Sequence, residues 1–227
     1  MPGTKGKKLD RREFLRLSGM LGIGTAAACT VFPATGTLAF DKKLAKASVT
    51  RNQMGTVVTI TALHASPGKA EDAVGAAFAE MDRVARLLDR HDASSPIGVL
   101  NAEGRLSGMP DEALEVLNQS REYHLLSGGT FDITVAPVVD LFKHYFARKG
   151  EPPPDKVLSG AVALVDGQGV TISGRAVSFA RPGMSVTLDG IAKGYVIDAG
   201  ARALEKAGVS HGLINAGGDI RAIGGKG

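Results

Sequence analysis

The chain has 227 residues, among them 30 glycines and one cysteine, and a formal net charge of +4. Residues 1–16 carry six Lys and Arg against Asp10 and Glu13, a net of +4, so the charge on the rest is close to zero. The basic balance is confined to the amino end and does not indicate nucleic-acid binding. The glycines follow no collagen-like period and 44% of residues are hydrophobic, which indicates a globular chain rich in turns.

The amino end, residues 1–39, is predicted to be a twin-arginine-type signal peptide. Arg11 and Arg12 precede an uncharged run of small and apolar residues, and this order of segments is typical of an export signal. Residues 37–39 resemble a small-residue cleavage site, and Pro33 interrupts the run, which disfavours a membrane-spanning helix. We therefore expect the Tat export machinery as a partner.

Cys29 is the only cysteine and lies inside the predicted signal. A lipid anchor at Cys29 is the less favoured alternative, because residues 26–28 lack the leucine of a usual lipobox. A chain without other thiols forms no internal disulfide and offers no cysteine to a metal. We expect an exported protein, either periplasmic or at the outer face of the cytoplasmic membrane.

Residues 40–227 are predicted to form one α+β domain, with helices marked by apolar residues at helical spacing and strands by β-branched runs between glycine turns. The three prolines at 152–154 predict a stiff connection. Helices are predicted after residues 66–68 with an apolar stripe that ends at Leu88, over 110–126 with Leu114, Leu117 and Leu125 buried, and over 193–207 with Val196, Ala203 and Leu204 buried. Strands are predicted over residues 56–63, 161–165, 170–172, 176–179, 185–188 and 212–215.

Two glycine-rich turns flank the last predicted helix and are the strongest indication of function. The first glycine turn, residues 187–195, reads Thr-Leu-Asp-Gly-Ile-Ala-Lys-Gly-Tyr, and the second glycine turn, residues 215–219, reads Asn-Ala-Gly-Gly-Asp. Glycines beside a carboxylate or a lysine suit a site where main chain approaches a phosphate and a charge meets it. Each turn alone is more typical of a plain strand-to-helix or helix-to-strand connection, but their pairing across one helix favours a nucleotide site.

Lys193 is the residue most strongly indicated as functional. A lysine in the first turn of a helix opposes the helix dipole, so a phosphate or carboxylate partner would account for its position. The second glycine turn is consistent with a contact to the nucleotide and also with a role in closing the sheet. Asp219 and Arg221 are, on the alternative interpretation, a local pair at the start of a strand.

Four motifs, in this order along the chain, resemble those of the ApbE family, the flavin transferases that attach FMN from FAD to exported redox proteins. The motifs are Met54-Gly55-Thr56, residues 92–101 with Ser-Ser-Pro and Leu-Asn, residues 129–137, and the two glycine turns. The resemblance implies a single ApbE-like domain over residues 40–227 with a mixed or antiparallel sheet and flanking helices. It also implies that the C-terminal part is missing, because family members continue well beyond the position of Gly227.

The resemblance implies that FAD binds where these segments meet, with Mg²⁺ at the carbonyl oxygen of Gly190. Thr187 and Asp189 depart from the family pattern, which has an aspartate and a glycine there, so either Asp189 takes over the ligand contact or the affinity is altered. The residues implied in FAD binding are Met54, His91, Thr130, Phe131, Asp132, Thr187, Asp189 and Lys193.

The residues alone leave alternatives open for several of these positions. Met54 and Phe131 are also typical of core packing, and Asp132 is typical of a helix cap. His91 falls where family members commonly place an aromatic near the flavin, whereas a loop histidine is otherwise often just solvated.

The implied reaction is a phosphoryl transfer, in which a threonine hydroxyl of an exported flavoprotein subunit attacks the FMN phosphorus of FAD and AMP leaves. Positioning and charge neutralisation dominate such reactions. Mg²⁺ and Lys193 would position the pyrophosphate and neutralise its charge. No catalytic base is assigned, because the family's base belongs to the missing part and the histidines here lie outside any matching motif. The alternatives are a non-catalytic exported FAD-binding accessory protein for flavoprotein maturation, and an FAD pyrophosphatase that uses water in place of threonine.

Overall fold

The computed structural model of the chain describes residues 44–224, and the predicted signal peptide therefore lies outside the described residues. The first sheet has four strands in the order β1-β2-β6-β7, with every neighbouring pair antiparallel. The turns that join β1 to β2 and β6 to β7 lie at the same end of this sheet, since Val58 is paired with Ala216 near both turns. The strands are β1 (Ala45–Gln53), β2 (Thr56–His64), β6 (His211–Ala216) and β7 (Asp219–Ile223).

Strands β2 and β6 confirm the strands predicted over residues 56–63 and 212–215. Strand β1 was not predicted, because Ala47 is its one buried residue and no apolar alternation marks it. Strand β7 agrees with the strand start suggested at Asp219, although its extent was not predicted, since only Ile223 at its end is buried. Half-exposed and edge strands carry little periodic signal.

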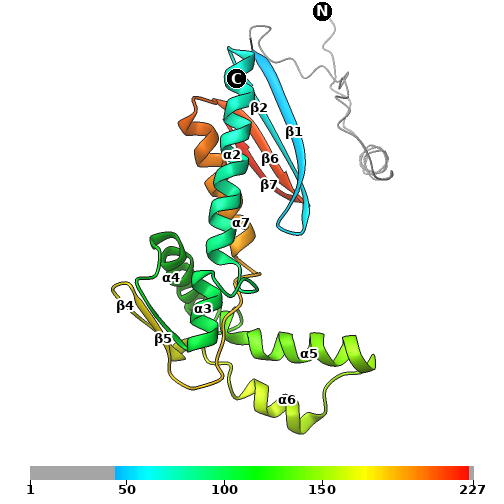
Figure 1. Cartoon of the computed structure of the whole chain (residues 1–227), viewed down its shortest axis with the longest axis vertical. Coiled ribbons are helices and arrows are strands. Elements are labelled where there is room, and N and C mark those ends of the chain that lie inside the picture. The colour runs from blue at the N-terminus through cyan, green and yellow to red at the C-terminus, as the bar shows by residue number, and fades with distance from the viewer. Residues whose placement is uncertain (1–43, 225–227) are drawn as a thin grey trace, which may run out of the picture. The chain divides into compact units, whose positions relative to one another are not determined.

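Helices α2 (Pro67–Leu88) and α7 (Ala192–Lys206) pack against each other and cover one face of this sheet (Figure 1). Gly200 permits the close crossing, because a Cβ atom there would lie 2.7 Å from Sδ of Met81. The apolar stripe predicted for α2 is buried, apart from Ala85, which is half-buried; its residues are Val74, Phe78, Met81, Val84, Ala85 and Leu88. In α7, Val196 and Leu204 are buried as predicted and Ala203 is half-buried.

Helix α4 (Asp111–Leu126) confirms the helix predicted over residues 110–126. Leu117 is buried and Leu114 is partly buried against the core. The predicted burial of Leu125 is wrong, because its side chain is 66% exposed. The buried stripe of α4 runs at helical spacing from Ala113 to Ser120 and continues to the position of residue 124, so residue 125 points away from it.

The second sheet is antiparallel, in the order β3-β5-β4. Its strand β3 lies in the chain between a short helix and α4, whereas β4 and β5 come later. Strands β4 and β5 confirm the predictions over residues 170–172 and 176–179, whereas the short helix was not predicted. These elements are α3 (Pro96–Glu103), β3 (Arg105–Ser107), β4 (Val170–Ser173) and β5 (Ala176–Phe179).

Helices α5 (Ala136–Lys149) and α6 (Asp155–Val162) lie on either side of the prolines at 152–154, which form the predicted connection. The strand predicted over residues 161–165 is wrong, because α6 begins directly after Pro154 and continues to Val162. The segment 185–188 is also not a strand, since its main chain bonds to a side chain and to an isolated carbonyl in place of a neighbouring strand.

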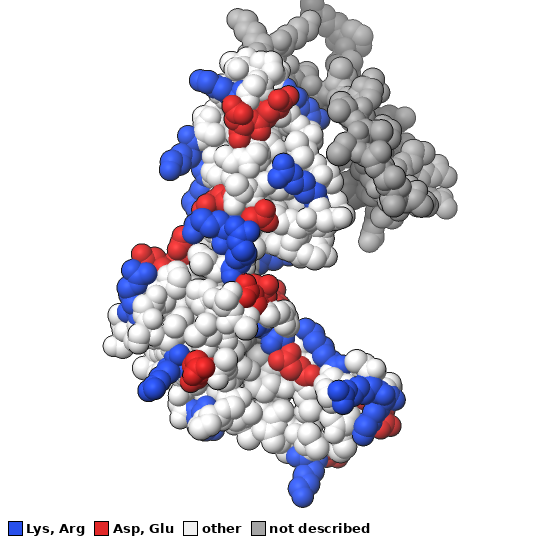
Figure 2. All heavy atoms as spheres, in the orientation of Figure 1, with Lys and Arg blue, Asp and Glu red and all other residues white. Residues whose placement is uncertain are grey.

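Two antiparallel sheets with flanking helices confirm the predicted α+β class. Among residues 44–224, no helix combines the length and the apolar character that crossing a bilayer requires. On the face drawn in Figure 2, acidic and basic side chains of the described residues are interspersed, with no broad area of a single sign.

Candidate functional site

The first glycine turn leads into α7 and presents its tip to solvent. Thr187 is buried, and its N–H donates to the carbonyl oxygen of Ile133 at 2.8 Å. The Thr187 hydroxyl accepts a hydrogen bond from the N–H of Asp189 at 3.3 Å, a local bond that stabilises the turn. Asp189 and Gly190 are exposed. Of the two departures from the family pattern, it is therefore Asp189 whose side chain is free to meet a ligand.

Phe131 contacts the first glycine turn from a loop that is distant in sequence. A Cβ atom at Gly190 would lie 3.2 Å from Cε2 of Phe131, so a glycine permits the close approach of the ring. The Phe131 ring also meets Tyr123 edge to face, with 6.1 Å between centroids. A shallow surface groove at this contact is lined by Tyr123, Leu126, Ser127, Phe131, Gly190 and Ile191.

Asp132 is engaged by the protein itself. Its carboxylate accepts hydrogen bonds from N–H and Oγ1 of Thr134, at 2.8 and 2.6 Å, and from the N–H of Gly167 at 3.0 Å. It thereby caps the 3-10 helix η1 (Ile133–Val135), which is the structural alternative that the sequence left open. A direct contact of Asp132 with FAD stays a prediction.

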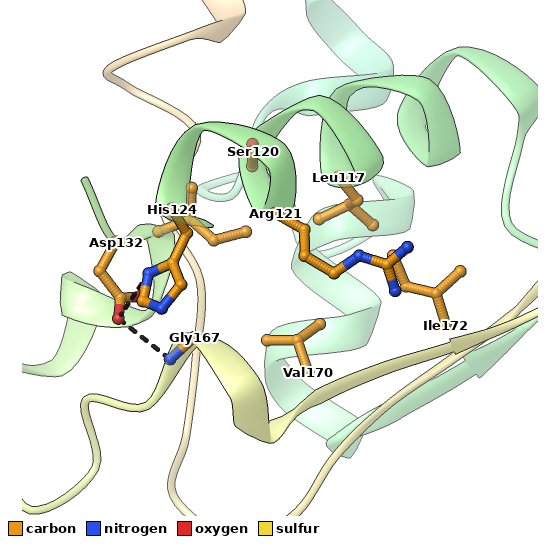
Figure 3. Close-up of a pocket in the computed structure, with 9 residues that line it drawn as sticks. Leu117, Ser120, Arg121, His124, Asp132, Gly167, Val170 and Ile172 are labelled. Carbon is orange, nitrogen blue, oxygen red and sulfur yellow. Dashed lines mark hydrogen bonds and ion pairs between the residues drawn. The ribbon is translucent and has the colours of Figure 1, made fainter. Parts of the chain in front are cut away.

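His124 of α4 lies beside Asp132 and Gly167, as Figure 3 shows. Its Nδ1 lies 3.0 Å from the carbonyl oxygen of Phe131 and 3.5 Å from Oδ2 of Asp132. A Cβ atom at Gly167 would lie 2.7 Å from the imidazole, so Gly167 leaves room for the ring. Thr130, one residue before Phe131, is exposed and bonded only through its N–H, to the carbonyl oxygen of Ser127 at 3.4 Å.

The second glycine turn joins β6 to β7 beside the start of β2. Gly217 has φ of 59° and donates its N–H to the carbonyl oxygen of Val57 at 3.1 Å. A Cβ atom at Gly217 would lie 2.2 Å from Oγ1 of Thr56, so no other residue fits without movement. The side chain of Asn215 accepts a hydrogen bond from the N–H of Gly218 at 3.0 Å, which closes the turn.

Met54 forms the neighbouring β1–β2 turn together with Gly55. Its φ of 52° is the one positive value at a non-glycine residue among those described, and Gly55 follows with 68°. This pair of positive angles is that of a type I′ hairpin turn, which normally takes asparagine or glycine. A methionine held in this strained conformation motivates a functional role for its side chain, although Met54 also packs partly against the core.

Lys193 connects the two glycine turns. Its Nζ lies 2.8 Å from Oδ2 of Asp219, and the two side chains are 35% and 57% exposed. This carboxylate partner accounts for a lysine at the start of α7, where a cation opposes the helix dipole and needs an anionic partner. The local pair suggested for Asp219 and Arg221 is wrong, because Arg221 instead pairs with Asp198 of α7 at 3.4 Å.

His91 lies in the exposed loop after α2, and its N–H donates to Oδ1 of Asp89 at 2.8 Å. The residue before it, Arg90, has a side chain that is only 6% exposed and binds Asp140 of α5 through two hydrogen bonds of 2.8 and 2.5 Å. These bonds hold the pKa of Asp140 below its ordinary value, and His91 adds a smaller effect of the same sign. The charge of Asp189 in turn helps to raise the pKa of Arg90, after the larger effect of Asp140.

Sequence analysis missed Arg90 and Asp140, because they are 50 positions apart and neither stands in a recognisable pattern. The described structure brings Phe131 to Gly190, Lys193 to Asp219, and the turn of Met54 to that of Gly217. It therefore gathers three of the four motifs through direct contacts. For His91, the described residues show no direct contact with the first glycine turn. Its neighbour Arg90 is influenced by the charge of Asp189 in that turn.

A magnesium ion held by protein side chains alone does not fit the described residues. Within residues 44–224, no three His, Cys, Asp or Glu side chains converge as a metal site requires. The tip of the first glycine turn nevertheless offers two hard oxygen donors, the carbonyl of Gly190 and the carboxylate of Asp189. Such a sparse donor set fits Mg²⁺ of the kind that keeps several waters and is shared with substrate phosphates.

These features define an α+β domain whose polar site lies at two glycine turns joined by an ion pair. The ApbE family model matches residues 54–227. The match covers more than half of the chain and includes all four motifs, so the chain belongs to the ApbE family.

Known relatives agree with this assignment. The chain is 29% identical over 140 residues to an FAD:protein FMN transferase of Vibrio cholerae, a match that covers 60% of this chain and 38% of the relative. It is 27% identical over 217 residues to an FAD:protein FMN transferase of Rhodobacter capsulatus, covering 88% of this chain and 39% of the relative. The fold resembles the flavin transferase ApbE from Vibrio cholerae with a TM-score of 0.72 and 25% identity, over 81% of this chain and 60% of that one. The chain thus spans about two fifths of the length of these curated relatives.

Proposed function

We propose that this chain carries the nucleotide-binding part of an FAD:protein FMN transferase. The observation that carries the proposal is the junction of the two glycine turns by Lys193 and Asp219, at the positions of the family's motifs. The junction places an ammonium group, an exposed carboxylate at Asp189 and the free carbonyl of Gly190 around the start of one helix. This combination suits a pyrophosphate whose charge is shared between a cation and a lysine.

The reaction is a displacement at phosphorus. The hydroxyl oxygen of a threonine on the acceptor protein forms a bond to the FMN phosphorus of FAD, the bond from this phosphorus to the bridging oxygen breaks, and AMP leaves. The hydroxyl proton passes to a base that the described residues do not identify. The products are an FMN–threonine phosphoester and AMP.

The residues of this chain serve binding and orientation. Lys193, on release from Asp219, neutralises a phosphate, and the groove beside Phe131 accepts an aromatic ring of the dinucleotide. The carbonyl of Gly190 and the carboxylate of Asp189 would hold Mg²⁺, which would neutralise charge at the pyrophosphate. Met54, His91 and Thr130 complete the proposed contacts around the ligand.

The acceptor is proposed to be an exported flavoprotein subunit, and the site of action the periplasm or the outer face of the cytoplasmic membrane. This part of the proposal rests on the twin-arginine pattern in residues 1–39. Export through the Tat machinery would bring the enzyme to the compartment of its acceptor.

Incubation of the full chain with FAD, Mg²⁺ and a threonine-containing acceptor protein tests the proposal. Transfer predicts a mass increase of the acceptor by one FMN phosphoester and an equal amount of released AMP, both lost in an acceptor whose threonine is replaced by valine. AMP release without acceptor would instead identify an FAD pyrophosphatase. Saturable FAD binding without AMP release would leave this chain with the nucleotide-binding role alone, as in a flavin-binding accessory protein. AMP release that needs no acceptor, or no FAD binding at all, would contradict the transferase.

A further inference from the structure

The segment that carries the first glycine turn has no strand beside it. Residues 180–191 lie between β5 and α7 without belonging to a helix or strand. Met184, Val186, Thr187 and Leu188 within this segment are nevertheless buried. Buried main-chain groups need hydrogen-bond partners, so something other than a sheet must hold the segment in place.

Asn101 of α3 provides that partner. Its Nδ2 donates to the carbonyl oxygen of Val186 at 2.9 Å, and the N–H of Val186 donates to Oδ1 of Asn101 at 2.7 Å. One side-chain amide therefore satisfies both main-chain groups of one residue, as a neighbouring strand would. The next residue, Thr187, is held from a separate element by its bond to Ile133.

Helix α3, which carries Asn101, is itself firmly held at its start. Ser95 caps α3 by accepting a hydrogen bond from the N–H of Gly98 at 2.9 Å, and its own hydroxyl donates to the carbonyl oxygen of Asp89. Gly98 packs so closely on the preceding loop that a Cβ atom would lie 2.0 Å from the carbonyl oxygen of Asp92. Replacement of the Asn101 side chain is therefore expected to move the turn segment and to leave α3 in place.

We propose that Asn101 is a positioning residue, which sets the place of Asp189 and Gly190 by clamping the main chain of Val186. The two exposed residues follow Val186 by three and four positions, and Phe131 closes on Gly190 from the other side. The clamp thus determines where the carboxylate and carbonyl stand relative to Lys193. The effect on ligand binding rests on the proposed function, whereas the clamp itself does not.

Two substitutions separate the clamp from simple packing. Asn101→Leu keeps the approximate volume and removes both hydrogen bonds. Asn101→Asp keeps the shape and can accept from Val186, but its carboxylate cannot donate to the carbonyl oxygen. A protonated Asp side chain has one donor and one acceptor, as the amide has. The carbonyl oxygen of Val186 and partial burial favour this protonated form and raise its pKa, so mild acid restores the clamp in this variant alone.

The first measurement is amide hydrogen exchange of the full chain without ligand. Exchange at Val186 and Thr187 is expected to accelerate in Asn101→Leu at every pH, and in Asn101→Asp at pH 8 but much less at pH 5, each compared with wild type at the same pH. Asn118→Asp is the matched control, because Asn118 is exposed on α4 and bonds only to the carbonyl oxygen of Leu114. Unchanged exchange at residues 186 and 187 in both Asn101 variants would overturn the clamp.

The second measurement is FAD affinity with Mg²⁺, again as a ratio to wild type at each pH. The expected loss is about tenfold in Asn101→Leu and in Asn101→Asp at pH 8, with recovery of the aspartate variant at pH 5. Accelerated exchange with unchanged FAD affinity would overturn the positioning role. If wild type binds no FAD, the proposed function fails and the exchange result still decides the clamp.

Discussion

Lys193 and Asp219 form an ion pair with 2.8 Å between Nζ and Oδ2, and this contact joins the two glycine turns. Both side chains are substantially exposed, so solvent screens the pair and its contribution to stability is small. We expect Asp219→Asn to lower the free energy of unfolding by less than about 1 kcal/mol and to retain FAD affinity, because it releases Lys193 for a phosphate. Urea unfolding and FAD titration measure the two effects. A loss of several kcal/mol would show that the pair is primarily structural.

Gly217 is predicted to be the least replaceable glycine of the second turn. Its φ of 59° and the 2.2 Å approach of a Cβ atom to Thr56 both oppose a side chain. We expect Gly217→Ala to lower the free energy of unfolding by about 1–3 kcal/mol. Gly75→Ala is the control, because Gly75 lies in α2 with no atom within 4 Å of a Cβ. It should stabilise the protein by up to about 1 kcal/mol, and equal effects of the two changes would contradict the assignment.

The Arg90–Asp140 pair predicts an asymmetry between its two partners. Arg90 is 6% exposed and Asp140 is 48% exposed in their side chains. Asp140→Ala leaves a buried guanidinium without its carboxylate and should cost about 2–3 kcal/mol, whereas Arg90→Met refills the buried volume and should cost about 1 kcal/mol. Chemical unfolding of both variants provides the measurement. An equal or reversed order would mean that Arg90 reaches water in solution.

The same pair predicts part of the acid sensitivity of the fold. The bonds from Arg90 lower the pKa of Asp140 in the folded protein, so the unfolded state binds a proton more readily. The resulting stabilisation is complete above the ordinary aspartate pKa of about 4 and is lost as the pH falls through the lower folded value. The melting temperature should therefore fall less steeply between pH 7 and pH 2 in Asp140→Asn than in wild type. Parallel curves would exclude this carboxylate as a contributor.

The elements that sequence analysis predicted correctly are those with a complete periodic signal. Helix α2 has an apolar residue on one face from Val74 to Leu88, and β2 alternates between the two faces of a sheet, so local pattern and tertiary burial coincide. The strand predicted over residues 161–165 was wrong because a short apolar run fits a helix end equally well. The segment 185–188 looked like a strand for a physical reason, since Val186, Thr187 and Leu188 are buried, but the partner of Val186 is the side chain of Asn101.

The candidate site shows a similar division. Lys193 could be singled out from the sequence, because its position against the helix dipole is a local property, and the resemblance supplied Met54 and Phe131. The resemblance also included Asn101, in the second motif, but neither its partner Val186 nor the pair of Arg90 and Asp140 could be found in the same way. Their hydrogen bonds join residues 50 and 85 positions apart, and no spacing in the sequence records such a contact.

FAD binding to the full chain tests the central claim most directly, measured by quenching of flavin fluorescence with Mg²⁺ in wild type, Lys193→Ala and Lys206→Ala. Lys206 lies at the opposite end of α7 and controls for the loss of a lysine from this helix. We predict saturable binding that Lys206→Ala retains and that Lys193→Ala weakens by about tenfold or more. A folded wild-type chain that binds no FAD, or a Lys193→Ala variant that binds as well as wild type, would contradict the account.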